Sequence, residues 1–222
     1  MIVIALDGPA GSGKSTVAKS LSQSLNIEYI DSGAIYRTLT LYCMNTYEGV
    51  CKGNENEVAA YFQENPKDIK IDYVDHVQKM VLRGEDVSGQ IRTPEVTRQI
   101  KYIADHPDCR AIVNAIMREV VKSYSAVIDG RDIGTKVFPD TPHKFYLDAK
   151  AEIRAKRRAL ELGIPVEGEP FQKLLTDIVE RDKSDSERAI APLCKAEDAI
   201  LVDTSLMDAD EVVAEIEKQI DL

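Results

Sequence analysis

The chain has 222 residues, of which 38 are acidic and 28 are basic, so its formal net charge is -10. This length suits one well-packed core with insertions rather than two large domains. The negative charge disfavours non-specific binding to nucleic acids and to anionic membranes, and no apolar run approaches the ~20 residues that span a bilayer. We therefore expect neither nucleic acid nor membrane among the partners.

The cysteines and histidines limit where the protein is expected to be located and which metal sites it is expected to have. The four cysteines form no C-x-x-C pair, which favours a reduced protein in the cytoplasm. The three histidines, at positions 76, 106 and 143, are too scattered to predict a histidine-based metal site. We expect a cytoplasmic monomer.

The first predicted element is a short apolar strand over residues 2–6, which is followed by a glycine-rich turn. Residues 8–15, GPAGSGKS, fit the pattern G-x-x-x-x-G-K-[ST] at every fixed position. Its glycines allow a positive φ angle, so that successive backbone N–H groups can turn inward as an anion nest. The next helix, predicted from Ser15 to about Leu25, directs its positive end at that nest.

This turn predicts a site for the phosphates of ATP or GTP. Lys14 is placed to neutralise the β- and γ-phosphates, and the Ser15 hydroxyl is placed to bind Mg²⁺. The alternative, an ordinary Gly/Ser-rich turn between a strand and a helix, explains the complete spacing poorly. The predicted ATP-binding residues are Gly8, Pro9, Ala10, Gly11, Ser12, Gly13, Lys14, Ser15 and Thr16.

Further along the chain, apolar stretches alternate with helical patterns, which predicts a doubly wound parallel sheet. The four further predicted strands cover residues 28–31, 126–130, 143–148 and 199–205. Because the carboxyl ends of parallel strands share one edge, ligands are expected there. The aspartates placed at this edge are Asp7, Asp31, Asp129 and Asp203. A last helix begins with Asp208 as its predicted N-cap.

Two segments exceed the simple strand–helix repeat. More than 90 residues separate the second strand from the third, and within them DIKIDYVDHVQKMVLRGEDVSG has the pattern of a small β-sheet. We predict an inserted arm. The second segment is dense in charge, which is typical of a solvated helix face, but its arginines recur at helical spacing and predict a lid. We divide this single unit, residues 1–222, into a core of 1–31, 119–150 and 189–222, an arm of 32–118 and a lid of 151–188.

A phosphate loop alone does not separate a kinase from a switch protein, a motor or a transport ATPase. The sequence contains no N-K-x-D, the motif by which GTP-specific switch proteins usually bind guanine. Its length also argues against a motor or a helicase. A compact kinase for a small acceptor is the remaining interpretation.

Four motifs identify the acceptor side. DSGAIYRTLT (31–40), LRGEDVSGQIRTPEV (82–96), DGRDIGTKVFPD (129–140) and RDKSDSERAIAPL (181–193) occur in the order and spacing of bacterial cytidylate kinases. The chain resembles that family over essentially its whole length. Adenylate kinases carry D-G-[FY]-P-R where this chain has Asp129-Gly130-Arg131-Asp132.

The resemblance implies a three-layer P-loop kinase fold with a five-stranded parallel sheet, an arm that carries a small β-sheet and a mobile lid. It also implies the reaction of ATP with CMP or dCMP, with Mg²⁺ as cofactor, giving ADP and CDP or dCDP. The residues it implies at the CMP site are Ser32, Tyr36, Arg37, Arg110, Arg131, Asp132, Arg181, Asp185 and Arg188.

The resemblance also gives these residues roles. It implies that Arg37 and Arg131 bind the acceptor phosphate and that Arg181 and Asp185 contact the sugar. The cytosine-reading group is Ser32, Arg110 and Arg188. The residues implied in catalysis are Lys14, Arg131, Arg154, Arg157 and Arg158, of which the last three are lid arginines.

Some points stay open in the sequence. Asp129 is expected to hold Mg²⁺ through water, whereas Asp132 is a candidate for orienting the neighbouring arginines. Lys101 stands where the family commonly has serine, so a short hydroxyl contact to the base is absent. The alternatives are a kinase for UMP, AMP or a non-nucleotide acceptor, and a nucleotide-dependent regulatory protein.

Overall fold

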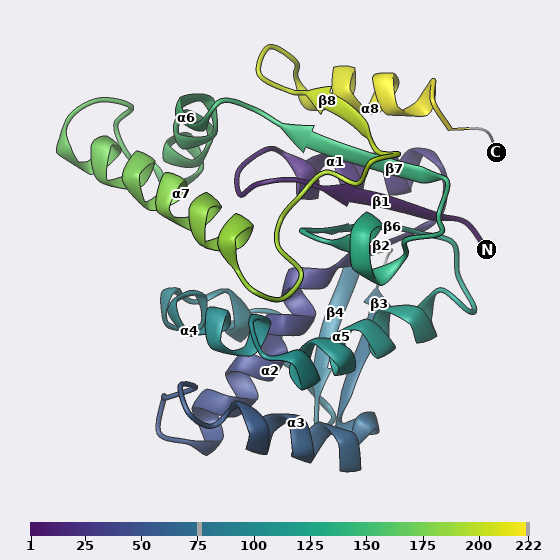
Figure 1. Cartoon of the computed structure of the whole chain (residues 1–222), viewed down its shortest axis with the longest axis vertical. Coiled ribbons are helices and arrows are strands. Elements are labelled where there is room, and N and C mark those ends of the chain that lie inside the picture. Colours follow the sequence, from purple (N-terminus) through teal and green to yellow (C-terminus); the bar gives the residue numbers. More distant parts are fainter. Residues whose placement is uncertain (75–76, 221–222) are drawn as a thin grey trace. The chain divides into compact units, whose positions relative to one another are not determined.

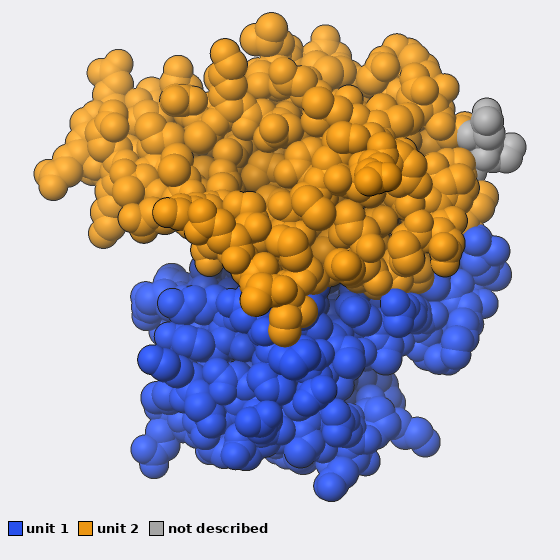
Figure 2. Space-filling view, in the orientation of Figure 1, with its two compact units in different colours: residues 1, 28–125 blue, residues 2–27, 126–222 orange. Residues whose placement is uncertain are grey.

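The computed structural model describes residues 1–74 and 77–220 and divides the chain into two compact units. One unit contains residue 1 and residues 28–125, and the other contains residues 2–27 and 126–222 (Figure 2). His76 lies outside the described residues. The predicted boundaries of core, arm and lid stay a prediction.

The second unit, of residues 2–27 and 126–222, carries the phosphate loop and most of the parallel sheet (Figure 1). Its strands are β1 (Val3–Asp7), β6 (Ala126–Gly130), β7 (His143–Asp148) and β8 (Ile200–Asp203). Its helices are α1 (Lys14–Ser24), the π-helical turn η3 (Ile133–Val137), α6 (Ala151–Leu162), α7 (Glu169–Glu187) and α8 (Ala209–Glu217).

The unit of residue 1 and residues 28–125 is built mainly of helices with a small antiparallel sheet. Its strands are β2 (Glu28–Asp31), β3 (Ile69–Val74), β4 (Val77–Leu82) and β5 (Glu85–Asp86). Its helices are α2 (Ser32–Thr46), α3 (Glu55–Glu64), η1 (Pro66–Asp68), η2 (Gln90–Arg92), α4 (Pro94–Ala104) and α5 (Pro107–Val120).

The five predicted parallel strands are confirmed, in the order β2-β6-β1-β7-β8. β1 is central, and the side chains of Ile4, Ala5 and Leu6 are completely buried, as expected for a strand covered on both faces. The register pairs Asp7 with Gly130 on β6 and with Tyr146 on β7. The carboxyl ends of these strands therefore meet at one edge, where polar side chains collect.

Two elements refine the sequence prediction. The small β-sheet expected in the long insertion is confirmed as the three-stranded antiparallel sheet β3-β4-β5. The apolar run at 199–205 predicts a strand with buried side chains, whereas in β8 Ile200 and Leu201 are exposed. β8 lies at one edge of the sheet beside β7, but β2 at the other edge keeps Tyr29 and Ile30 buried, so edge position alone does not account for this exposure.

Helices α6 and α7 pack side by side and share a small apolar cluster (Figure 1). Its buried members are Ala155, Ala159, Phe171 and Ile178. The polar faces of both helices remain available for other contacts, which fits the amphipathic spacing of the charged segment. No helix in the described part of the chain is long and apolar enough to cross a membrane.

Three of the four cysteines are buried in the unit of residue 1 and residues 28–125. They are Cys43, Cys51 and Cys109. The neighbouring Cys51 side chain, together with burial, raises the pKa of Cys43. Cys194 is exposed.

Asp31 holds the start of α2. Its Oδ1 accepts a hydrogen bond from the Ala34 N–H at 3.0 Å, and its Oδ2 pairs with Arg92 at 2.9 Å. The Asp31 N–H donates in turn to the Gln78 side chain at 2.6 Å. An N-cap carboxylate satisfies a helix donor that otherwise lacks a partner, so Asp31 fixes the turn that carries Ser32.

Asp31→Ala is expected to lower the free energy of unfolding by about 1–2 kcal/mol, since it removes the cap and the ion pair together. Asp31→Asn keeps a capping oxygen and loses only a partly exposed pair, so we expect a cost below about 1 kcal/mol. Urea unfolding followed by circular dichroism measures both. Equal costs for the two variants would show that the cap contributes nothing.

Candidate functional site

The phosphate loop, residues 8–13, joins β1 to α1 through three glycines with positive φ angles. A Cβ atom on Gly8 would lie 2.0 Å from the Leu147 carbonyl oxygen, so only glycine fits there. Gly13, with φ of 90°, caps α1. The loop therefore lies tightly against β7, and the N-terminus of α1 opens onto it.

Lys14 crosses the phosphate loop. Its Nζ donates to the Pro9 carbonyl at 2.6 Å and to the Ser12 hydroxyl at 3.2 Å. Burial, with the positive charge of Arg131, lowers the pKa of Lys14 well below its ordinary value, against the opposing charges of Asp129 and Asp7. A phosphate next to Nζ would favour the charged ammonium, so an anion completes this site electrostatically.

Two contacts hold the outer side of the loop. Arg154 donates from NH1 to the Ala10 carbonyl at 2.9 Å. The Thr204 hydroxyl donates to the Ser12 carbonyl at 3.1 Å and also lies 3.1 Å from the Asp148 carbonyl. The loop is thus fixed at two carbonyls, one from α6 and one from the residue that follows β8.

Ser15 and Asp129 meet at the edge of the sheet. The Ser15 hydroxyl donates to Asp129 Oδ2 at 2.6 Å, and Asp129 is buried at the end of β6. A hydroxyl beside a carboxylate supplies the hard oxygen atoms that Mg²⁺ prefers, with water and phosphate as its other ligands. No three His, Cys, Asp or Glu side chains group as a metal cage in the part of the chain that the structure describes. The residues present fit a magnesium ion shared with a nucleotide.

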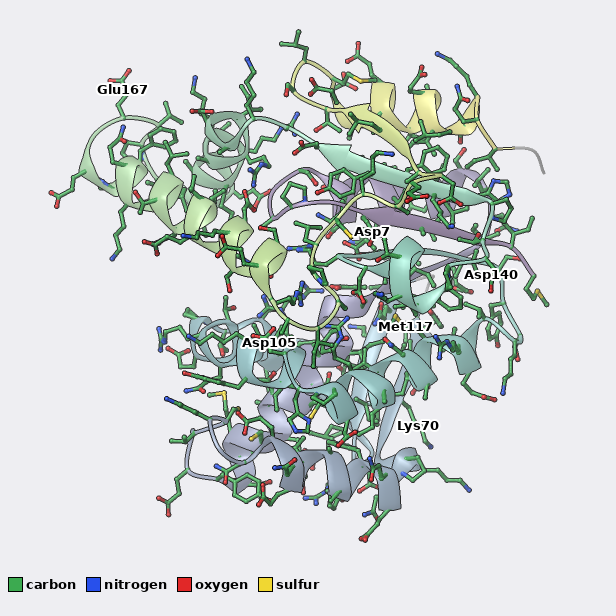
Figure 3. The ribbon with its side chains drawn as sticks, in the orientation of Figure 1. Asp7, Lys70, Asp105, Met117, Asp140 and Glu167 are labelled. Carbon is green, nitrogen blue, oxygen red and sulfur yellow. The ribbon has the colours of Figure 1, made fainter. Side chains whose placement is uncertain are left out.

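Asp7 connects the phosphate loop to the turn after β6 and is labelled in Figure 3. Its two carboxylate oxygens accept hydrogen bonds from the N–H groups of Ile133 and Gly134, each at 2.8 Å. Burial raises the pKa of Asp7 to about 6, although these two hydrogen bonds favour the ionised form. The sequence placed Asp7 at this edge but did not predict its partners.

A second group in the same unit surrounds Asp185 on α7. Its Oδ2 pairs with Arg131 Nε at 2.9 Å, and its Oδ1 lies 3.5 Å from Arg188 NH2. Burial raises the pKa of Asp185, but the guanidinium groups of Arg131, Arg188 and Arg181 outweigh it and leave this pKa below its ordinary value. The structure therefore brings together four of the residues predicted for the CMP site. Asp132, a fifth, is buried next to Arg131.

Helix α7 ends before the last of the charged residues around Asp185. Arg181, Asp185 and Arg188 have the spacing of one helix face, but α7 ends at Glu187 and Arg188 is extended. Arg188 returns to the helix through its Nε, which donates to the Asp185 carbonyl at 3.2 Å. The contact survives because the chain turns at this point.

The three predicted lid arginines lie on α6 but have different surroundings. Arg154 is buried, while Arg158 is exposed and pairs with Glu161 at 2.7 Å. Arg157 donates from NH1 to the Thr204 hydroxyl at 3.0 Å and from NH2 to the Thr204 carbonyl at 2.5 Å. A shared helix face thus does not give a shared partner.

The unit of residue 1 and residues 28–125 holds the other predicted acceptor residues. Ser32 and Tyr36 are both buried, four positions apart on α2, and thus share one face of that helix. The guanidinium of Arg110 lies 5.5 Å from the centre of the Tyr36 ring, a cation–π distance, and donates to the Ala104 carbonyl at 2.9 Å. This pairing joins two predicted residues that are 74 positions apart.

Arg37 and Lys101 complete this group. Arg37 NH1 donates to the Thr97 hydroxyl at 2.8 Å. The ammonium of the exposed Lys101 lies 5.1 Å from the centre of the half-buried neighbouring ring, Tyr102, so the charge that replaces a serine has an aromatic partner of its own.

Sequence reasoning missed two side chains: Thr204, which contacts the phosphate loop, and Asp182, which pairs with the arginine that contacts the loop. Thr204 had a usable signal, since it is the polar residue directly after the last parallel strand. Asp182 had a weaker signal, because it lies three positions before Asp185 and therefore on the same helix face. Their partners lie 28 to 192 positions away, which no local pattern encodes.

Comparisons with known proteins agree with the geometry. The family model described as cytidylate kinase matches residues 4–222. A cytidylate kinase of Anoxybacillus flavithermus is 44% identical over 97% of this chain and 94% of its own length. One of Clostridioides difficile is 39% identical over 100% of this chain and 99% of its own length.

One solved structure supports the fold alone. A crystal structure of an uncharacterized protein from Eubacterium ventriosum covers 100% of this chain and 99% of its own chain. The TM-score is 0.53 and the sequence identity is 16%. At that identity the likeness says nothing of the substrate.

The Asp7 carboxyl gives a pH dependence whose sign can be worked out. Its pKa is about 6 in the folded chain and 3.8 ordinarily, so the folded chain binds this proton more tightly. The stability that Asp7 contributes is therefore largest in acid and is lost as the pH rises through about 6. Between about pH 4 and about pH 7, the wild type is expected to lose up to about 3 kcal/mol relative to Asp7→Asn.

Urea unfolding of the wild type and of Asp7→Asn across this pH range measures the difference between their free energies of unfolding. Titrating groups that both proteins share contribute equally to the two values and cancel in the difference. A difference that stays constant, or that grows in favour of the wild type as the pH rises, would contradict the assignment.

Proposed function

Because the chain belongs to the cytidylate kinase family, we propose that it transfers the γ-phosphoryl group of ATP to CMP and dCMP, forming CDP and dCDP. The phosphate loop is the observation that carries this proposal, since it presents an anion nest, a buried lysine and a helix N-terminus to one ligand. The family match over residues 4–222 supplies the acceptor.

The protein's task in phosphoryl transfer is to align the two phosphates and to balance charge. The N–H groups of the loop hold the donor phosphates, and Lys14 exchanges the Pro9 carbonyl for a phosphate oxygen. The acceptor phosphate is already ionised at neutral pH, so no dedicated general base is needed. Arg157 and Arg158 are proposed to act with Arg154 on the charge that develops at the γ-phosphoryl group.

Ser15 and Asp129 are the proposed residues for Mg²⁺, Ser15 directly and Asp129 through water. When bound, the ion neutralises charge on the donor phosphates. The Ser15 hydroxyl donates to Asp129 Oδ2, which brings the two proposed oxygen ligands together at the end of β6.

For the acceptor, we propose that guanidinium groups bind the phosphate and that Ser32, Arg110 and Arg188 read the base. A guanidinium offers two parallel N–H donors to a phosphate, which suits Arg37 and Arg131 to this role. Asp185 keeps Arg131 and Arg188 in place through its two oxygens, besides its proposed contact to the ribose. Residues 32–118 are then the acceptor-binding arm and residues 151–188 the lid, whose closure excludes water.

We further expect a monomer in the cytoplasm, where its nucleotide substrates are found. A kinase for UMP, AMP or a non-nucleotide acceptor differs from this proposal only in the acceptor. A panel of monophosphates with coupled detection of ADP separates these activities, and CMP and dCMP are expected to give the highest rates. Preference for another acceptor would refute the proposal.

Lys14→Ala is expected to reduce CMP-dependent ADP formation to background while the chain stays folded. Burial lowers the pKa of Lys14, so the charged ammonium does not stabilise the fold and its loss leaves the chain folded. The same loss removes a positive charge that stabilises the transferring phosphoryl group. Coupled ADP detection and thermal unfolding measure the two effects. Lys19→Ala, at an exposed position of the same helix, is the control, and transfer by Lys14→Ala at the control's rate would contradict the role.

Arg188→Ala is expected to weaken the preference for CMP over UMP more than it weakens ATP binding, because Arg188 is proposed to read the base. The specificity ratio of kcat/KM values for the two acceptors, together with KM for ATP, measures this difference. Arg98→Ala removes an exposed guanidinium paired with Glu95 and serves as control. An unchanged ratio in Arg188→Ala would exclude this residue from base reading.

A further inference from the structure

Asp182 on α7 joins the arginine that holds the phosphate loop. Its Oδ2 accepts a hydrogen bond from Arg154 NH2 at 2.5 Å, and Arg154 is buried. Its Oδ1 is buried without a hydrogen-bond partner among the described residues. A buried carboxylate oxygen that lacks a partner costs free energy, so stability alone does not explain an aspartate here.

Arg154 is held from three directions at once. Its Nε donates to the Ala149 carbonyl at 2.8 Å, NH1 donates to the Ala10 carbonyl at 2.9 Å, and NH2 donates to Asp182. A guanidinium has five N–H donors in a rigid plane. These three contacts therefore fix its orientation and leave two donors for a ligand, so the positioning of Arg154 and a direct contact with phosphate are compatible.

The contact at Ala10 sets the direction of the next N–H group. A trans peptide unit is planar, so its C=O and N–H bonds point in opposite directions. No peptide bond among the described residues is cis. When Arg154 holds the Ala10 carbonyl outward, the Gly11 N–H faces the opposite side of the loop, where the nest binds anions.

Close packing enforces this arrangement. A Cβ atom on Gly11 would lie 3.2 Å from Arg154 Cβ, and Gly11 has a φ of 77°. The loop thus rests directly on the arginine. Without a carboxylate behind it, the guanidinium would be drawn toward bound phosphates and would release the Ala10 carbonyl.

We propose that Asp182 is a positioning residue, which holds Arg154 on the Ala10 carbonyl and thereby aims the Gly11 N–H at the phosphates of ATP. The proposal rests on the proposed function for its substrate, ATP. Because Asp182 acts through Arg154 on the phosphate loop, its removal is expected to affect the donor side of the reaction selectively.

The test compares Asp182→Asn with Asp177→Asn, which makes the same change of charge at an exposed position of α7. ATP affinity is measured directly by titration calorimetry, and KM for ATP and for CMP by coupled detection of ADP. For Asp182→Asn we expect the Kd and KM for ATP to rise about three- to tenfold, with KM for CMP nearly unchanged. Equal ATP affinities in the two variants, or equal rises of both KM values, would overturn the proposal.

A double-mutant cycle separates positioning from a general structural role. Arg154→Met removes the guanidinium, so adding Asp182→Asn to it is expected to cause no further loss of ATP affinity. Additive losses would overturn the proposal. If Asp182→Asn unfolds at a lower temperature than Asp177→Asn, Asp182→Glu restores the carboxylate, and recovery of stability without recovery of ATP affinity would equally overturn it.

The two proposals fail in different ways. If the wild type binds ATP but forms no ADP in response to CMP or dCMP, the proposed function is refuted. The calorimetric titrations and the cycle still decide the role of Asp182, because they need no acceptor.

Discussion

The rest of the site depends on the close contact between the phosphate loop and the strand beside it. Gly8 lies so near the Leu147 carbonyl that a methyl group would overlap it, and a methyl group on Gly11 would make a tight 3.2 Å contact with Arg154 Cβ. A loop packed this closely has little freedom to rotate its peptide units. Its N–H groups are therefore oriented before a ligand arrives, and binding costs less conformational entropy than it would in a mobile loop.

Carboxylates within the protein offset part of the positive charge of the site. Asp185 pairs with Arg131 and Arg188, Asp182 pairs with Arg154, and Glu161 pairs with Arg158 on the surface. This explains how a chain with a net charge of -10 keeps a cluster of guanidinium groups. A nucleotide must compete with these carboxylates, and the partly buried pairs give way less readily than the exposed one.

Much of the fold could be predicted from the sequence because its signals are local. The apolar run at residues 2–6, the glycine spacing of the phosphate loop and the Asp208 cap each depend on neighbouring residues, and each is confirmed. What the sequence could not reveal is long-range. The hydrogen bond from Thr204 to Ser12 joins residues 192 positions apart. The same holds for Arg157, whose partner at Thr204 is unrelated to its spacing from Arg154.

The unequal burial of the cysteines has a practical consequence. Cys43, Cys51 and Cys109 are enclosed in the unit of residue 1 and residues 28–125, whereas Cys194 is exposed shortly after α7. Thiol-reactive reagents need access to the sulfur, so a maleimide dye would label the native chain selectively at Cys194. The unaltered protein thus offers a natural attachment point for a fluorophore just beyond the helix that carries Asp182 and Asp185.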